Sequence, residues 1–306
     1  MNGKGVLDGK VLLVTGGGHG IGREIALLAA REGANVVVND LGSTPRGEGR
    51  DNAAAGAVVD LIRQEGGEAV ANGGDVSSFD DAKAMVKQAV DSFGRIDAVA
   101  SIAGISRDAA FHKMTEQDFD LVVNVNLKGS FNVARAAADF FRPQMTGAML
   151  HTTSTAGLIG YRGMANYAAA KMGIAGLSRA ISLDMARFNV RSNCMAPHAW
   201  SRMAAQMVAR TPEEAARVER QKAMSADKVA PLAVYLLSDL ASGITGQVFG
   251  VRQNEIYLYN QPRQARSVHR EAGWSARGIH EHAIPSMRQF FTGPEDSSQV
   301  IGWDPI

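Results

Sequence analysis

The chain of 306 residues has very little cysteine and no long apolar run. Cys194 is its only cysteine, so no disulfide can form within the chain, and a reducing compartment is expected. Because Cys194 lies in an apolar segment, we interpret it as a buried structural thiol. No stretch approaches the roughly 18 apolar residues of a membrane span, and neither a signal-peptide core nor a peroxisomal terminal address is recognisable. The sequence therefore predicts a cytoplasmic protein that is not inserted in a membrane.

The chain also lacks an excess of either positive or negative charge. The chain carries 32 Lys and Arg against 31 Asp and Glu, a formal net charge of +1, so no whole-molecule field attracts nucleic acid or an anionic membrane. With 45% hydrophobic and 21% charged residues, the composition excludes a disordered, collagen-like or disulfide-scaffold protein. Glycine, in contrast, is abundant at 33 residues, and the positions of these glycines carry the functional argument.

Short β-branched runs alternate with amphipathic helical patterns over the first 250 residues. The predicted strands are 11–15, 35–39, 68–72, 98–102, 148–153, 190–195 and 246–250. The predicted helices are 21–32, 53–65, 80–93, 117–141, 166–188 and 227–238. This alternation is typical of βαβ units, so we expect an α/β, Rossmann-like, doubly wound parallel sheet of about seven strands with helices on both faces.

The regular hydrophobic periodicity of the sequence ends near residue 251. Residues 252–306 show no clean period of 2 or 3.6 residues, yet they contain apolar side chains such as Trp274, Phe290 and Phe291. We therefore predict one α/β domain over residues 1–251 and an irregular C-terminal extension over 252–306. The extension is expected to pack on the body or on a neighbouring subunit.

A glycine-rich turn joins the first strand to the first helix. Gly16, Gly20 and Gly22 give a G-x-x-x-G-x-G spacing, which differs from G-x-G-x-x-G because position 21 is Ile. Glycine permits positive φ and leaves no Cβ in the way of a phosphate, and a helix N-terminus offers unpaired N–H groups. We predict that this turn, including His19 and Ile21, binds the pyrophosphate of a dinucleotide. A plain tight turn is the alternative.

Acidic residues end the next two strands. Asp40 closes the second strand, where a carboxylate can accept hydrogen bonds from an adenosine ribose and repels a 2′-phosphate, which favours NAD over NADP. Asp75, followed by Val76, can likewise meet the adenine, with its carboxylate and the next backbone amide facing the ring. A turn or helix cap remains the alternative for each Asp.

Tyr167 and Lys171 stand four residues apart within a helical pattern, so both side chains lie on one face. A neighbouring ammonium favours the phenolate and lowers the pKa of a tyrosine from its usual value near 10, which makes a usable general acid or base. Ser154 follows a strand upstream, and Asn126 lies within an earlier helical pattern. A solvated helix face would be the alternative for the Tyr–Lys pair taken alone.

Together these motifs resemble the short-chain dehydrogenase/reductase superfamily over residues 5–250. The resemblance rests on Gly16, Gly20, Gly22, Asp75, Val76, Ala103, Gly104, Asn126, Ser154, Tyr167, Lys171 and the segment 193–197. It implies that Tyr167 transfers a proton, Ser154 holds the substrate oxygen, and Lys171 binds the nicotinamide ribose and lowers the pKa of Tyr167. It also implies that Asn126 anchors a water linking Lys171 to solvent. Ala103, Gly104 and Pro197 would border the cofactor.

The resemblance also implies an activity. We expect an NAD-dependent oxidoreductase acting on CH–OH donors, without a metal, as a homodimer or homotetramer. Residues 37–42 and 66–72, and the tail segments 267–274 and 303–305, resemble the (3R)-hydroxyacyl-CoA dehydrogenase branch of peroxisomal multifunctional enzymes and its bacterial relatives. The substrate would then be hydrophobic or acyl-CoA-linked, of hydroxyacyl-CoA or hydroxysteroid type. Independently of the resemblance, the apolar stripe of Trp200, Met203 and Met207 predicts a lid over such a substrate, and a plain core stripe is the alternative.

Two positions depart from the family pattern. Ser101-Ile102 replaces Asn-Asn before Ala103, and His198 replaces the glycine after Pro197. His198 could contact the substrate or the cofactor, and a loop residue turned to solvent is the alternative. Neither change touches the proton-transfer groups, so activity is still expected. The competing hypothesis is a catalytically silent NAD(H)-sensing or scaffold protein.

Overall fold

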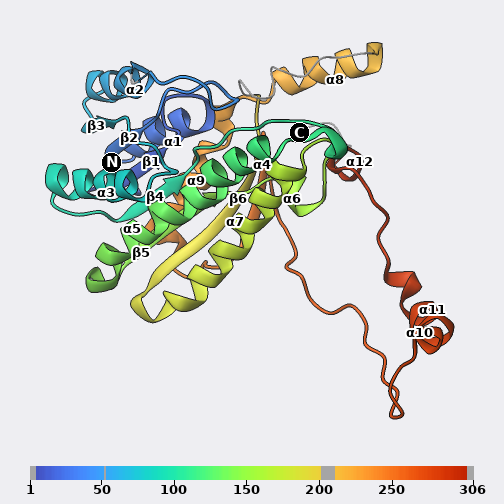
Figure 1. Cartoon of the computed structure of the whole chain (residues 1–306). Helices are drawn as coiled ribbons and strands as arrows, with labels where there is room; N and C mark the ends of the chain where they lie inside the picture. The colour runs from blue at the N-terminus through green and yellow to red at the C-terminus, as the bar shows by residue number, and fades with distance from the viewer. Residues whose placement is uncertain (1–4, 52, 201–210, 302–306) are drawn as a thin grey trace.

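The computed structural model describes residues 5–51, 53–200 and 211–301. A sheet of eight strands runs through its centre, in the order β3-β2-β1-β4-β5-β6-β7-β8 (Figure 1). The strands are β1 Val11–Thr15, β2 Asn35–Asn39, β3 Ala69–Asn72, β4 Ala98–Ser101, β5 Gly147–Thr152, β6 Val190–His198, β7 Val248–Arg252 and β8 Glu255–Leu258. All neighbouring pairs are parallel except β7 and β8, which are antiparallel.

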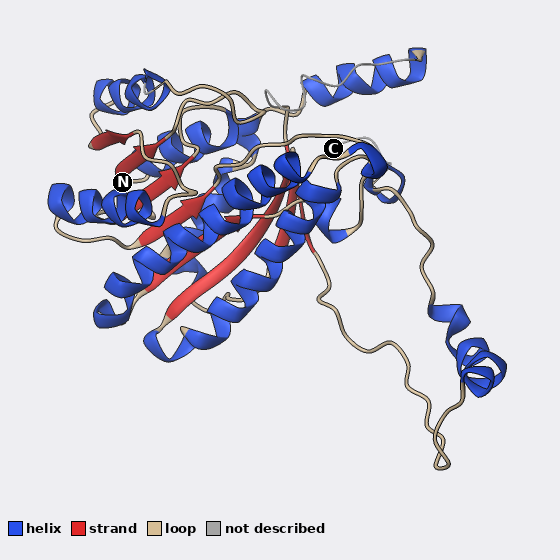
Figure 2. Cartoon of the chain, in the orientation of Figure 1, coloured by secondary structure: helices blue, strands red, loops and turns tan. Residues whose placement is uncertain are grey.

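Helices cover both faces of the sheet (Figure 2). Before the C-terminal extension the helices are α1 Gly20–Arg31, α2 Ala53–Gln64, α3 Phe79–Phe93, α4 Glu116–Val123, α5 Gly129–Gln144, α6 Thr155–Leu158, α7 Ala165–Asp184, α8 Pro212–Lys222 and α9 Ala230–Leu237. Helix α8 projects away from the sheet (Figure 1). Strand β1 is buried throughout, as expected for a parallel strand covered on both faces. Leu12 and Val14 pack with α1, α2 and α9, whereas Val11 and Leu13 pack with α3 and α5. The predicted doubly wound sheet is confirmed.

The sheet extends further than the sequence predicts. The last predicted strand lies at Val248–Arg252, and a turn through Gln253, whose φ is +53°, leads into β8. Strand β8 falls within the segment that we expected to be irregular. Strand β8 is an edge strand that follows β7 without a helix between them. The alternation of strands and helices therefore does not predict it.

The C-terminal extension leaves the body after β8 and returns to it at its end (Figure 1). Its helices are short: α10 Ala276–Gly278, α11 Ile284–Met287 and α12 Ser297–Val300. The backbone N–H of Ser297 donates to Gly160 O at 2.9 Å, so α12 contacts the loop between α6 and α7. Trp274 and Phe291 remain 38% and 60% exposed. Contact with the body is therefore found around α12, while packing of the rest on a neighbouring subunit stays a prediction.

Some predicted features lie outside the described residues, namely the lid residues Met203 and Met207 and the tail segment 303–305. In the part of the chain that the structure describes, no helix is long and apolar enough to cross a membrane. Cys194 is buried in β6, as predicted, and burial raises the pKa of its thiol to about 12.

Candidate active site

The order of the strands reverses between β1 and β4, and in a doubly wound sheet ligands bind beside the carboxyl ends of the strands at such a point. A cavity of about 330 Å³ opens there. Its lining includes nearly all of the predicted site residues, namely Gly16, His19, Gly20, Ile21, Gly22, Asp40, Asp75, Val76, Ala103, Gly104, Ser154, Tyr167, Lys171 and Pro197. Asn126 is the exception, because it lies behind Gly104. The structure therefore brings together residues that are spread over more than 180 positions of the chain.

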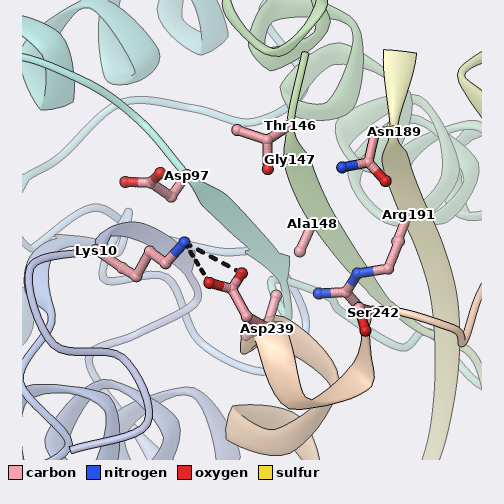
Figure 3. A pocket seen from close by; sticks show the side chains of 10 residues that line it. Lys10, Asp97, Thr146, Gly147, Ala148, Asn189, Arg191, Asp239 and Ser242 are labelled. Atoms are coloured by element: carbon pink, nitrogen blue, oxygen red, sulfur yellow. Dashed lines mark hydrogen bonds and ion pairs between the residues drawn. The ribbon is translucent and has the colours of Figure 1, made fainter. Parts of the chain in front are cut away.

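A second, smaller hollow of about 50 Å³ lies at the amino ends of β1, β4, β5 and β6, opposite the cavity (Figure 3). Lys10 and Asp239 form an ion pair across it at 2.8 Å. Arg191 donates to the carbonyl oxygens of Leu236 and Ser238 at 2.6 and 2.8 Å. These contacts tie the loop after α9 to strand β6, so we assign this hollow a structural role.

The glycine-rich turn is packed so tightly that side chains are excluded from it. A Cβ on Gly16 would lie 2.8 Å from the backbone of Ala103, and a Cβ on Gly22 would lie 2.1 Å from Gly16 O. Helix α1 begins at Gly20, and the His19 side chain makes no capping hydrogen bond. The N–H groups of the first turn therefore remain for the oxygens of a bound phosphate. This arrangement fits a dinucleotide pyrophosphate.

The carboxylate of Asp40 is buried at the end of β2. It accepts hydrogen bonds from the N–H groups of Gly18 and Gly42, each at 2.8 Å, and it also lines the cavity. Asp40 therefore does cap the adjoining turns, as the alternative interpretation predicted. The same hydrogen bonds hold its carboxylate at the cavity wall. Asp75 accepts from the N–H and the hydroxyl of Ser77, each at 2.8 Å. Ser78 is the residue that caps α3, so Asp75 is not the helix cap.

Lys171 is only 2% exposed on helix α7, and its Nζ donates to Thr152 O at 2.8 Å. Its ammonium lies 5.4 Å from the centre of the Tyr167 ring. Burial lowers the pKa of Lys171 to about 8. Burial also raises the pKa of Tyr167 to about 12, and a hydrogen bond with Ser154 opposes this shift. The lower tyrosine pKa implied by the resemblance is therefore not found in this arrangement, because burial outweighs the hydrogen bond with Ser154.

Asn126 lies in a π-helical turn, Asn124–Lys128, that interrupts the path from α4 to α5. Such turns are frequent at functional sites. Its Nδ2 donates to the carbonyl oxygens of Ile105 and Val122, both at 2.9 Å. Its Oδ1 is buried and has no hydrogen-bond partner among the described residues. A Cβ on Gly104 would lie 2.5 Å from this oxygen and 3.5 Å from Lys171 Nζ, so only glycine fits between them.

The two departures from the family pattern have different surroundings. Beside Ser101, the hydroxyl of Thr15 accepts from the N–H groups of Ile102 and Ala103 at 3.2 and 3.3 Å, and this supports the loop under the cavity. His198 is the last residue of β6 and does not line the cavity. Its Nε2 is buried without a partner in the described part of the chain, and burial lowers its pKa to about 4. His198 is therefore neither a solvent-facing loop residue nor a cavity residue here.

Sequence reasoning missed several residues of this site. Thr152 supplies the oxygen that holds Lys171, and Asn166 is fully buried directly before Tyr167. The loop after β2 was assigned no role, although five of its residues line the cavity: Leu41, Ser43, Thr44, Pro45 and Gly47. The sequence alone does not show that a polar residue such as Asn166, within a helical pattern, is buried.

Among the described residues, no group of three or more His, Cys, Asp or Glu side chains is arranged to hold a metal ion.

A doubly wound sheet with a glycine-rich turn and a Ser, Tyr and Lys at its crevice defines a class of nicotinamide-dependent oxidoreductases. Comparisons with known proteins lead to the same class. Residues 16–252 match a family model described as enoyl-(acyl carrier protein) reductase. The chain is 34% identical over 305 residues to hydroxyacyl-CoA dehydrogenase ChsB1 of Mycobacterium tuberculosis, covering 95% of this chain and 92% of that protein.

Two further relatives extend this comparison. The peroxisomal multifunctional enzyme type 2 of Mus musculus is 43% identical over 229 residues, which cover 75% of this chain and 30% of that enzyme. The crystal structure of a short chain dehydrogenase from Mycobacterium avium superposes with a TM-score of 0.82 at 36% identity, covering 95% of this chain and 99% of that one. The chain thus spans about a third of the mouse enzyme but nearly all of the mycobacterial relatives. It belongs to the short-chain dehydrogenase/reductase superfamily, whose dehydrogenases use nicotinamide cofactors.

Proposed function

We propose that the protein is an NAD-dependent dehydrogenase that interconverts a secondary alcohol and a ketone. The observation that carries the proposal is that Ser154, Tyr167 and Lys171 line one cavity with the glycine-rich turn and Asp40. A reacting carbon held near Tyr167 would then share its cavity with a dinucleotide whose pyrophosphate lies at the start of α1.

When bound, the nicotinamide exchanges a hydride with the substrate carbon. Tyr167 passes a proton to or from the substrate oxygen, and Ser154 holds that oxygen by a hydrogen bond. Lys171, with a pKa of about 8, is protonated at neutral pH, so its ammonium favours the phenolate form of Tyr167 and can donate to a ribose hydroxyl. Asn126 presents its buried, unpartnered Oδ1 beside Lys171, which suits a water that relays protons to solvent.

NAD is the preferred cofactor in this proposal. The support is the fixed carboxylate of Asp40 at the cavity wall, because it would repel a 2′-phosphate. Arg50 lies on the neighbouring loop but donates to Gly73 O at 3.1 Å, so its guanidinium is engaged elsewhere.

The substrate is proposed to be hydrophobic or linked to coenzyme A, of hydroxyacyl-CoA or hydroxysteroid type. Apolar side chains of Ile102, Ile105, Leu121 and Val125 contribute to the cavity and would favour such a substrate over a sugar. The relative from Mycobacterium tuberculosis is a hydroxyacyl-CoA dehydrogenase by name, which supports the same substrate class.

The substitution Tyr167→Phe tests the mechanism. It removes the proton donor while keeping the ring, so turnover should fall by about 10²-fold or more while NADH binding, followed by fluorescence, persists. Unchanged turnover in the variant would refute the assignment of Tyr167. The substrate is sought by screening β-hydroxyacyl thioesters, hydroxysteroids and aryl alcohols with both NAD and NADP.

A catalytically silent NAD(H)-sensing or scaffold protein is the second candidate. It is favoured by the raised pKa of Tyr167, near 12, and by the altered Ser101 and His198 positions. Tight NADH binding without turnover on any substrate of the screen would select this candidate. Turnover that depends on Tyr167 would reject it.

We further propose a homodimer or homotetramer located in the cytoplasm. The apolar side chains of the C-terminal extension, among them Phe291, support an assembly in which a neighbouring subunit covers them. The single buried Cys194 supports a reducing compartment.

A further inference from the structure

One wall of the cavity is formed by residues 41–51, which we name the strap. It leaves the end of β2 after Asp40 and returns to its own start, where the N–H of Asp51 donates to Leu41 O at 3.0 Å. At its tip, the N–H of Thr44 donates to Glu48 O at 2.8 Å. The strap thus holds a closed loop shape and faces the cavity with residues such as Pro45.

The tip of the strap reaches across to the loop that follows β4. The N–H of Ser106 donates to Pro45 O at 3.0 Å. Gly47 lies so close to Ile105 that a Cβ there would stand 2.8 Å from Ile105 Cδ1 and 3.5 Å from Leu121 Cδ2. The strap therefore spans the cavity from the Asp40 side to the side of Ala103 and Gly104.

Arg107 fastens the tip of the strap. Its Nε donates to Arg46 O at 2.9 Å, and its Nη1 donates to the carboxylate of Asp118 on α4 at 2.9 Å. These bonds hold the pKa of the Asp118 carboxyl below its usual range. The planar guanidinium makes both bonds at once, which the single ammonium of a lysine cannot reproduce with the same geometry.

The backbone of Arg107 leads on to the catalytic helix. Asn166, which is 0% exposed, donates its Nδ2 to Arg107 O at 3.0 Å and to Asp118 O at 3.3 Å. The Oδ1 of Asn166 accepts from the N–H of Tyr167 at 2.7 Å. A continuous set of hydrogen bonds therefore runs from the strap, through Arg107 and Asn166, to the backbone of the tyrosine.

We propose that Arg107 is a positioning residue that fastens the strap to the start of helix α7, so that closure of the strap over the dinucleotide and placement of Tyr167 are coupled. The inference rests on the proposed function in one respect, the dinucleotide in the cavity. The fastening of the strap to α7 is a property of the chain itself and is measurable without any cofactor.

Arg107→Met and Arg107→Lys test the coupling. Amide hydrogen exchange of the ligand-free protein should become about tenfold faster both in the strap and around residues 164–168. The strap loses the guanidinium that binds Arg46 O, and the backbone carbonyl of Arg107 that Asn166 binds is no longer held in place through Asp118. NADH affinity should weaken by roughly three- to tenfold, with kcat falling as well. Lys113→Met is the control, because it removes a positive charge from the connection between β4 and α4, as Arg107→Met does, but at an exposed position. Amide exchange, NADH affinity and kcat should each stay within about twofold of wild type.

A pair of glycine substitutions tests the strap without touching Arg107. Gly47 and Gly49 have φ of +81° and +80°, so an alanine meets the same backbone strain at both positions. Only Gly47→Ala also collides with Ile105, since nothing lies within 4 Å of a Cβ at Gly49. Gly47→Ala should accelerate strap exchange and weaken NADH binding at least about threefold more than Gly49→Ala does.

The outcomes separate this inference from the proposed function. Faster exchange in the strap alone, with residues 164–168 unchanged, would overturn the coupling even if NADH binds well. Equal behaviour of Gly47→Ala and Gly49→Ala would overturn the role of the strap in closure. A wild-type protein that binds no NADH would refute the proposed function, and the exchange measurements would still decide whether Arg107 joins the strap to α7.

Discussion

Lys171 follows Tyr167 by one turn of helix α7, and its ammonium lies 5.4 Å from the centre of the tyrosine ring while it donates to Thr152 O. The two pKa values move in opposite directions, to about 8 for Lys171 and about 12 for Tyr167, because burial disfavours the charged form of each. An ammonium held at 2% exposure destabilises the folded protein at neutral pH. The site thus retains a charge that folding alone would not favour, as expected of a functional group.

Lys171→Met should therefore abolish turnover and stabilise the ligand-free protein. The folded pKa of Lys171, about 8, lies below its unfolded value near 10.4, so the unfolded state binds more protons between these values. The wild-type free energy of unfolding should gain a contribution of order 2–3 kcal/mol as pH rises through that window, and the variant should lack it. Urea unfolding of both proteins at pH 7 and 9.5 checks this. Cys194, whose pKa burial raises, opposes the trend and is present in both proteins. Identical pH dependence of the two proteins would contradict the prediction.

His151 should make the protein sensitive to acid. This histidine is fully buried in β5, and neither ring nitrogen has a partner among the described residues. Burial lowers its pKa to about 4, so it stays neutral in the folded state while the unfolded state takes up a proton below about pH 6.5. Stability is then complete above pH 6.5 and falls as pH drops towards 4, by of order 3 kcal/mol.

The substitution His151→Leu isolates this effect, because leucine fills a similar volume without a titrating group. Urea unfolding at pH 7, 5.5 and 4.5 should show a shallower loss of stability in the variant. His198, whose pKa is also lowered to about 4, remains in both proteins and cancels in the comparison. Parallel pH curves would rule out the buried imidazole of His151 as a cause of acid sensitivity.

Gly104→Ala should damage catalysis more than folding. The added Cβ would stand 2.5 Å from Asn126 Oδ1 and 3.5 Å from Lys171 Nζ, so it displaces the Asn126 amide from its two carbonyl partners. We expect kcat to fall by at least about tenfold and stability by about 1–3 kcal/mol. Gly56→Ala in helix α2 is the matched control, because nothing lies within 4 Å of its Cβ. Steady-state kinetics and urea unfolding check both variants, and a fully active Gly104→Ala enzyme would contradict the assigned packing.

The fold was predictable where the pattern was local. A continuous apolar run such as Val11–Thr15 predicts a parallel strand that is covered on both faces. The glycines at 16, 20 and 22 predict the turn that follows it. The antiparallel strand β8 was missed because a short edge strand lacks the strand–helix alternation that identified the others. The π-helical turn at Asn126 was also beyond prediction, because one extra residue in a helix leaves no mark on its hydrophobic period.

That the proposed site residues lie together was predictable, but their pKa shifts were not. Tyr167, Lys171 and Ser154 follow from motif spacing, and they do line one cavity. The direction of the Tyr167 pKa shift depends on burial, which no sequence spacing reveals. Contacts such as that of Thr15 with Ala103, 88 residues apart, exist only once β1 and β4 lie side by side.

Asp40→Asn should shift the cofactor preference towards NADP. The amide removes the negative charge that repels a 2′-phosphate, so the ratio of NADP to NAD affinity should rise by about tenfold, or about 1.4 kcal/mol. Affinity for NAD itself should fall, because the amide turns a donor towards one of the N–H groups of Gly18 and Gly42. Asp60→Asn on the exposed face of α2 controls for net charge. Fluorescence titration with both cofactors gives the ratio, and an unchanged ratio would remove Asp40 as the determinant of preference.

The C-terminal extension should hold subunits together. Phe291 and Trp274 are 60% and 38% exposed on a segment that leaves the body and returns to it, so their burial requires another chain. The wild type should sediment as a dimer or tetramer at micromolar concentration, and Trp274→Ser with Phe291→Ser should shift it towards a smaller species. Urea unfolding should change little, because neither side chain belongs to the sheet core. Phe111→Ser removes a phenylalanine of the body that is 82% exposed and should leave the assembly intact, whereas a monomeric wild type would refute the assembly outright.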